Sequence, residues 1–230
     1  MTIHVCTFAS ESFLLPQSRQ KADFMHLNFP ESELHFFTDK DLDAEFYKKV
    51  PYASEKNKYG FFTFKPYILE KLLNKIPEND LLIYLDVNDK PLKGLGEYAE
   101  MVMSENSNFN ILAASTNYPN VRYISNLHRK RLSFFTRIAS HFKYQPEAGA
   151  LIIRNNSETR ALLRVWIELT LINSDALNRF DDGCGRWDQE TLFLLSIINN
   201  SVHFESWKKY RFFKLGIRKY IDWEFYRGRT

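Results

Sequence analysis

The sequence predicts an α/β protein with a mainly parallel central sheet flanked by helices. Two observations lead to this prediction. Short apolar runs alternate with longer segments of helical period up to about residue 170. One run, LLIYL at 81–85, is apolar at every position, as in a strand that is covered on both faces. This alternation is typical of sheets whose parallel strands are joined by helices that pack on the sheet faces.

The expected elements follow in order along the chain. Strands are expected at 2–8, 33–38, 81–85, 109–114 and 149–154. Helices are expected at 16–27, 63–75, 95–104, 158–171 and 189–198. The helix at 63–75 has Pro66 in its first turn, where proline is tolerated. Ser157 is expected to cap the helix that follows it.

Length and composition predict one domain in the cytosol. The chain has 230 residues, of which 44% are hydrophobic, so it can bury a large single core. Two cysteines do not form a disulfide framework in a chain of this length. The first residues do not resemble a signal peptide, and no apolar run reaches the roughly 18 residues that a membrane span needs.

Basic residues are concentrated in two stretches. Residues 205–230 contain eight Lys or Arg against three acids, and residues 106–146 contain six and no acid. The 207–229 segment mixes these charges with aromatic residues, which predicts contact with an anionic membrane surface. An ordinary terminal helix with a solvated basic face is the simpler alternative.

Polar residues follow three of the expected strands, at 7–10, 38–40 and 86–89. In a doubly wound sheet these ends lie on one edge, where such proteins bind ligands, so together they predict a nucleotide site. A solvated acidic turn is the alternative for the third cluster.

The acidic turn has the composition of a metal site. Side chains alternate along an extended segment, so Asp86 and Asn88 point the same way, and a turn brings Asp89 round. Such oxygen ligands suit Mg²⁺ or Mn²⁺, which also bind substrate diphosphates. The sequence has neither GxxxxGK[ST] nor GxGxxG, which argues against a P-loop and a dinucleotide-binding enzyme.

Four segments carry a resemblance to a known superfamily. YLDVND at 84–89 resembles the Asp-x-Asp motif that binds metal and nucleotide sugar in glycosyltransferases of the GT-A fold. Three further segments are similar to motifs of bacterial capsule and lipopolysaccharide transferases, in the same order: YGFFTFKPYILEKL (59–72), EAGALIIRNNSETRALLRVWIEL (147–169) and GRWDQETLFLLSI (185–197). The resemblance covers about residues 2–205 and extends distantly to family 8 galactosyl- and glucosyltransferases. Asn88 replaces the usual second Asp.

This resemblance implies a GT-A-like (Rossmann-like) catalytic domain at 1–205, followed by a basic aromatic tail at 206–230. It implies a metal-dependent hexosyltransferase that uses Mn²⁺ or Mg²⁺ and a nucleotide-sugar donor, expected to be a UDP-sugar. The acceptor is expected to be a saccharide or glycolipid in cell-surface polysaccharide or lipopolysaccharide synthesis. The enzyme would be cytoplasmic or peripheral at the inner face of the cell membrane, with the basic stretch at 128–138 near an anionic acceptor.

The resemblance also implies roles for individual residues. The metal ligands would be Asp86, Asn88 and Asp89. The donor would be bound by Thr7, Ser10, Tyr59, Lys65, Tyr84, Asp86 and Gly149, with Phe61 beside the base or sugar. The catalytic pair would be Asp188, as a base or a stabiliser of positive charge at the sugar, and Gln189. Asp181 and Asp182 are the runners-up for the role of Asp188.

Simpler interpretations remain open for several of these residues. Lys65 could be a solvated lysine in a first helical turn, and Asp188 an ordinary helix cap. The aromatic residues could be core, and Gly149 a glycine at the start of a strand. Asn88 leaves open an inactive relative that binds sugar or nucleotide without turnover. The basic and aromatic residues suggest a nucleic-acid-binding protein as another alternative, although no motif of that class is present.

Overall fold

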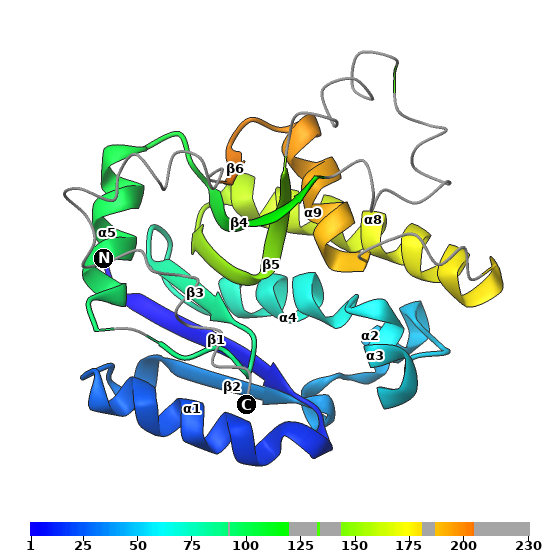
Figure 1. The fold of residues 1–230 in the computed structure, drawn as a ribbon, viewed down its shortest axis with the longest axis horizontal. Coiled ribbons are helices and arrows are strands. Elements are labelled where there is room, and N and C mark those ends of the chain that lie inside the picture. The colour runs from blue at the N-terminus through cyan, green and yellow to red at the C-terminus, as the bar shows by residue number, and fades with distance from the viewer. Residues whose placement is uncertain (92, 120–132, 134–143, 181–186, 205–230) are drawn as a thin grey trace.

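A computed structural model describes residues 1–91, 93–119, 133, 144–180 and 187–204. Its described strands form one six-stranded sheet in the order β2-β1-β3-β5-β4-β6 (Figure 1). The strands are β1 (Ile3–Ala9), β2 (Leu34–Thr38), β3 (Leu81–Leu85), β4 (Ile111–Pro119), β5 (Tyr144–Arg154) and β6 (Val202–Phe204). The predicted α/β class is confirmed.

Five of the six strands point the same way. β1 pairs in parallel with β2 and β3, and β4 pairs in parallel with β6, whereas β5 is antiparallel to β3 and β4. The sheet is therefore mainly parallel, as predicted, with β5 reversed in its middle. Leu85, the last residue of β3, lies opposite Ala150 of β5, so Gly149 meets the carboxyl edge of the sheet.

Helices cover both faces of this sheet (Figure 1). The longer helices are α1 (Leu14–His26), α4 (Phe64–Leu73), α5 (Leu95–Glu105), α8 (Ser157–Phe180) and α9 (Trp187–Ile198), and the shorter ones are α2 (Ala44–Lys49) and α3 (Lys58–Phe61). One core cluster packs α4, α8 and α9 against Leu82 and Tyr84 of β3. The other packs α1 and α5 against Leu81 and Ile83 of the same strand. β3 is thus buried on both faces, as its unbroken apolar run predicts.

Several element boundaries differ from the predicted ones. Helix α8 continues to Phe180, nine residues beyond its expected end. Its cap is Asn156 and not Ser157, because the Asn156 Oδ1 accepts hydrogen bonds from the Thr159 N–H (2.7 Å) and the Thr159 hydroxyl (2.9 Å). Helix α2 and strand β6 were not expected, since both are short and carry little periodicity.

The chain enters α4 through a left-handed turn. Lys58, Tyr59, Gly60, Phe61 and Phe62 all have positive φ, between 51° and 73°. Four of these residues have side chains, for which this conformation is strained. Local hydrogen bonds hold the turn: Asn57 Oδ1 accepts from the Gly60 N–H, and the Thr63 hydroxyl donates to the Gly60 carbonyl at 2.6 Å. The turn fixes the start of the helix that carries Lys65.

No helix among the described residues is long and apolar enough to cross a membrane. The predicted basic tail at 206–230 lies outside the described residues, as do Asp181, Asp182 and all of the 128–138 stretch except Ser133.

Candidate functional site

The centre of the candidate site is a buried lysine between two aspartates. Lys65, in the first turn of α4, is only 1% exposed. Its ammonium lies 2.5 Å from Asp188 Oδ2 and 3.2 Å from Asp86 Oδ1, and it donates to the Ala148 carbonyl at 3.0 Å. The interpretation of Lys65 as a solvated residue is therefore wrong. One side chain joins α4, α9, β5 and the end of β3.

With all three groups ionised, Lys65, Asp86 and Asp188 together carry one net negative charge. Burial by itself lowers the pKa of Lys65, but the charges of Asp188 and Asp86 outweigh it, so the pKa lies above its ordinary value and the ammonium stays charged. Burial raises the pKa of Asp188; Lys65 opposes this effect and the charge of Asp86 adds to it. One cation between two carboxylates attracts a further cation at the exposed side of the cluster.

Asp86 is the exposed member of the cluster. Its side chain is 45% exposed, and its Oδ1 accepts a 2.9 Å hydrogen bond from the Tyr84 hydroxyl besides meeting Lys65. Burial and the charge of Asp86 raise the pKa of Tyr84 well above its ordinary value, so this hydroxyl keeps its proton. Tyr84 itself is buried in the core, and its ring lies 5.1 Å from the Lys65 ammonium.

Gly149 makes room for Asp86. A Cβ atom at position 149 would lie 2.6 Å from Asp86 Oδ2 and 3.1 Å from its Cγ. The Asp86 N–H donates to the Gly149 carbonyl at 2.8 Å, so backbone and carboxylate meet at the same residue. The role of Gly149 beside a donor sugar stays a prediction. The structure shows a separate requirement for glycine here, because any side chain would collide with the Asp86 carboxylate.

Gln20 anchors the acidic turn, and sequence reasoning missed it. Its Nε2 donates to the carbonyls of Asp86 (2.9 Å) and Asp89 (2.7 Å). The Asp89 N–H also donates to the Asp86 carbonyl at 2.9 Å, which closes the turn. The sequence shows only that Gln17, Gln20 and Phe24 share one face of α1; the structure shows that all three are buried. A buried glutamine needs a polar partner, and the turn supplies it.

The acidic turn fits a hard divalent cation. Among the described residues, the hydrogen bonds and ion pairs of the Asp86 carboxylate use Oδ1, which leaves Oδ2 for another ligand. Asn88 is exposed and Asp89 half-buried, and both lie in the same turn. Mg²⁺ and Mn²⁺ need only one or two protein carboxylates and take water and phosphate oxygens as further ligands. The ligand set Asp86, Asn88 and Asp89 stays a prediction.

Asp188 and Gln189 open helix α9. The helix begins at Trp187, so Asp188 lies inside its first turn rather than at a cap position. Its Oδ1 accepts from the Gln189 N–H at 3.0 Å, and its side chain is 9% exposed. The Gln189 Oε1 is buried without a hydrogen-bond partner among the described residues. It is an acceptor that a ligand hydroxyl could satisfy.

The other predicted donor-binding residues lie around the same edge. Thr7 is fully buried near the end of β1, and its hydroxyl has no hydrogen-bond partner in the described part of the chain. Ser10 is half-buried, and its hydroxyl lies 3.1 Å from that of Ser12. The Tyr59 ring packs edge-on against Phe8 in the core, and Phe61 is half-buried. Their roles toward a donor stay predictions.

Comparison with known proteins gives distant likenesses only. Neither a protein-family model nor a curated protein matches the sequence. Among solved structures, the chain is similar to a glycosyltransferase involved in glycosylation of the major capsid of PBCV-1, with 10% identity, coverage of 89% of this chain and 81% of that one, and a TM-score of 0.47. It is also similar to apo mouse xyloside xylosyltransferase 1, with 10% identity, coverage of 96% and 93%, and a TM-score of 0.48.

A third structure is the galactosyltransferase LgtC in complex with donor and acceptor sugar analogues. Its identity is 14%, its coverage 98% of this chain and 82% of that one, and its TM-score 0.43. At this identity, and with TM-scores below 0.5, the likenesses neither place the chain in a family nor assign it an activity.

Proposed function

We propose that this protein is a glycosyltransferase that transfers a hexose from a UDP-sugar to a saccharide or glycolipid acceptor. The observation that carries the proposal is the cluster of Lys65, Asp86 and Asp188. It joins the turn that resembles an Asp-x-Asp motif to the helix that resembles the acceptor segment. The cluster lies at the carboxyl edge of the sheet, where α/β proteins bind ligands.

The exposed face of the cluster suits a diphosphate with its cation. Asp86, with Asn88 and Asp89, would hold Mn²⁺ or Mg²⁺, which neutralises the leaving nucleoside diphosphate when it is bound. Tyr84 and Lys65 contact Asp86 Oδ1 from the buried side of the cluster, so the carboxylate is held in one orientation before a ligand binds. Gln20 holds the backbone of the turn in the same way.

The buried side of the cluster suits positioning rather than proton transfer. Lys65 makes three contacts through its ammonium, which uses the three N–H groups that a lysine has. Both oxygens of Asp188 are engaged, by Lys65 and by the Gln189 N–H. Asp188 therefore fixes Lys65, and the Gln189 amide is the group that remains to bind a sugar hydroxyl.

The proposal includes the biosynthetic pathway in which the enzyme acts and its location in the cell. A donor of this class is used in the synthesis of cell-surface polysaccharide or lipopolysaccharide at the inner face of the cell membrane. The basic aromatic segment at 207–229 would attach the enzyme to anionic lipid there.

A second candidate is a relative that binds nucleotide sugar without turnover. Asn88 stands where the motif has a second carboxylate, and an amide oxygen adds no charge toward a cation. The ion pair of Asp188 with Lys65 points the same way, because the ammonium stabilises the ionised carboxylate and so weakens it as a base.

The test is calorimetric titration of UDP, with and without Mn²⁺, into wild type and Asp86→Asn. We expect binding that requires the metal and is weakened at least tenfold by Asp86→Asn, because the variant keeps the shape of the side chain and loses its charge. Glu105→Gln removes the same charge from an exposed position at the end of α5 and should bind like wild type.

Release of UDP from a panel of UDP-sugars, with acceptor saccharides present, separates the two candidates. Turnover supports the transferase, and metal-dependent binding without turnover supports the binding protein. If no nucleoside diphosphate binds in a metal-dependent way, both are wrong and the turn is structural.

A further inference from the structure

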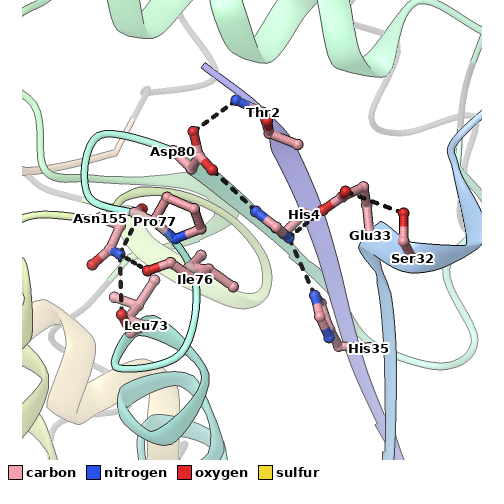
Figure 2. Close-up of polar contacts among 10 residues, drawn as sticks. All are labelled: Thr2, His4, Ser32, Glu33, His35, Leu73, Ile76, Pro77, Asp80 and Asn155. Carbon is pink, nitrogen blue, oxygen red and sulfur yellow. Dashed lines mark hydrogen bonds and ion pairs between the residues drawn. The ribbon is translucent and has the colours of Figure 1, made fainter.

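A second polar cluster lies at the opposite, amino edge of the sheet. Figure 2 shows His4 near the start of β1, with Glu33 and His35 from the start of β2 on one side and Asp80 from the approach to β3 on the other. The His4 Nδ1 lies 2.6 Å from Glu33 Oε2 and 3.2 Å from His35 Nε2. One ligand atom from each of the three residues lies within 4.8 Å of the other two.

We propose that His4, Glu33 and His35 form a binding site for a borderline transition-metal cation such as Zn²⁺. Two imidazole nitrogens and one carboxylate oxygen make up a common set of three protein ligands for zinc. An ion about 2.1 Å from each atom needs tetrahedral ligands spaced by roughly 3.4 Å. The His4–His35 spacing already matches this value, and the His4–Glu33 spacing reaches it by a shift of less than 1 Å.

A metal ion can interact with all three ligand atoms of this cluster, whereas a single proton cannot. Both Glu33 and His35 approach the same nitrogen of His4, and an N–H bond points along one line. A single proton on Nδ1 can therefore reach only one of the two. A cation at the point where the three atoms converge interacts with all of them.

The surroundings of His4 prepare its Nδ1 for this role. On the other side of the ring, Nε2 lies 3.2 Å from Asp80 Oδ2, while Asp80 Oδ1 accepts from the Thr2 N–H at 2.7 Å. With a metal ion on Nδ1, the ring proton would lie on Nε2 and would be donated to Asp80. A carboxylate behind a ligating histidine in this way orients the ring and raises its basicity. Ser32 donates to Glu33 Oε1 at 3.2 Å and orients the third ligand.

Burial leaves one side of the site open to water. His4 is 6% exposed, whereas Glu33, just before β2, and His35, on β2, are half-buried, and β2 lies at the end of the strand order. Three protein ligands and a water complete a four-coordinate zinc site. Such an ion would tie β2 to β1 and add to the stability of the folded chain.

The site is separate from the acidic turn in position and in chemistry. His4 lies opposite Leu82, and Asp86 lies four residues further along, or roughly 13 Å at strand spacing. Imidazole ligands favour zinc, cobalt, nickel and copper over the hard ions that oxygen ligands select. Zn²⁺ at the amino edge and Mn²⁺ at the carboxyl edge can therefore be measured independently.

The test uses untagged protein, freed of metal by a chelator, with Zn²⁺ and Co²⁺ as probes. We expect one equivalent of Zn²⁺ to bind and to raise the melting temperature, and Co²⁺ to give the visible absorption of a four-coordinate site. His35→Gln should weaken Zn²⁺ binding at least tenfold. His26→Gln, at an exposed histidine in the last turn of α1, is the matched control and should bind like wild type.

Asp86→Asn distinguishes the two sites and keeps this inference independent of the proposed function. The inference predicts that Asp86→Asn binds Zn²⁺ like wild type and gives the same Co²⁺ spectrum. Loss of Zn²⁺ binding in Asp86→Asn would assign the ion to the acidic turn and overturn the inference. Equal Zn²⁺ affinity in His35→Gln and wild type, or no Zn²⁺ binding to wild type, would also overturn it. The metal-free melting temperature of each variant shows that it is folded.

Discussion

Helix α4 carries two lysine–aspartate pairs of nearly equal length in opposite surroundings. Near its start, Lys65 lies 2.5 Å from Asp188, and both side chains are at most 9% exposed. Near its end, Lys71 lies 2.6 Å from Asp43, with side chains 35% and 42% exposed. The distances do not distinguish the pairs, but burial does. Water solvates the two charges of a separated surface pair, so separating them costs little free energy. A buried charge that loses its partner is not solvated, so breaking a buried pair is strongly destabilising.

The difference shows which charges belong to the candidate site. The pair of Lys71 joins α4 to the cap of α2, where Asp43 also accepts from the Phe46 N–H and the Tyr67 hydroxyl. It is a surface contact that organises one helix start. Lys65 joins α4, α9, β5 and the end of β3 at the edge of the sheet and also fixes the Asp86 carboxylate. The contacts that stabilise this pair therefore also shape the proposed ligand site.

The largest expected effect is the loss of the buried lysine. Lys65→Met leaves Asp188 buried without its cation and should lower the free energy of unfolding by about 3–5 kcal/mol. Lys71→Met removes the exposed pair and should cost less than about 1 kcal/mol. Urea unfolding at neutral pH measures both variants.

The double variant Lys65→Met/Asp188→Leu tests the physical reason. Removing both charges and filling the space with apolar side chains should recover much of the loss, because no buried charge remains unpaired. Equal stability of Lys65→Met and Lys71→Met would show that burial does not separate the two pairs.

The second prediction tests the fit between Gly149 and Asp86. Gly149→Ala puts a methyl group 2.6 Å from Asp86 Oδ2, in a carboxylate whose other oxygen, Oδ1, is held by Lys65 and Tyr84. We expect a loss of about 1–3 kcal/mol in the free energy of unfolding from overpacking. Metal-dependent UDP binding should weaken as well, because the carboxylate must move. Both are measured on the same preparation, by urea unfolding and by calorimetry.

Gly96→Ala is the control for that change. The nearest atom to a Cβ there is Ile3 Cδ1, at 3.2 Å, which is the far end of a flexible side chain. In helix α5 this substitution should be neutral or stabilising by up to about 1 kcal/mol. Gly149→Ala behaving like Gly96→Ala would mean that Asp86 is free to rotate away.

Much of the fold was predictable because its signals are local. Each of the five predicted strands is present, since runs such as 81–85 carry their burial in the sequence itself. The reversed direction of β5 has no local signal, because it depends on how the chain returns to the sheet. The left-handed turn at 58–62 was equally hidden, since only one of its residues is a glycine.

The members of the site were predictable, but their pairing was not. Asp86, Lys65 and Asp188 were each singled out by type and position. From the sequence, Lys65 can be either a donor-binding or a solvated lysine, because its burial comes from contacts with Ala148 and Asp188, far along the chain. Only the folded structure brings these residues together.

The smallest expected effect is the acid response of the exposed pair. Hydrogen bonds from Lys71, Tyr67 and the Phe46 N–H hold the pKa of Asp43 well below its ordinary value of 3.8. The unfolded chain therefore binds more protons in the range between the two values. The stability that Asp43 contributes is complete above pH 3.8 and is lost as the pH falls through the lowered pKa.

Asp43→Asn isolates that contribution, because asparagine also caps helices and only the charge is lost. The difference in the free energy of unfolding between wild type and Asp43→Asn should be under about 1 kcal/mol at pH 6 and should shrink below pH 3. Lys71→Met should reduce the same acid dependence, since Lys71 is the largest cause of the lowered pKa. A difference that stays constant from pH 6 to pH 2.5 would show that the exposed pair contributes no charge interaction, and the contrast with Lys65 would then be complete.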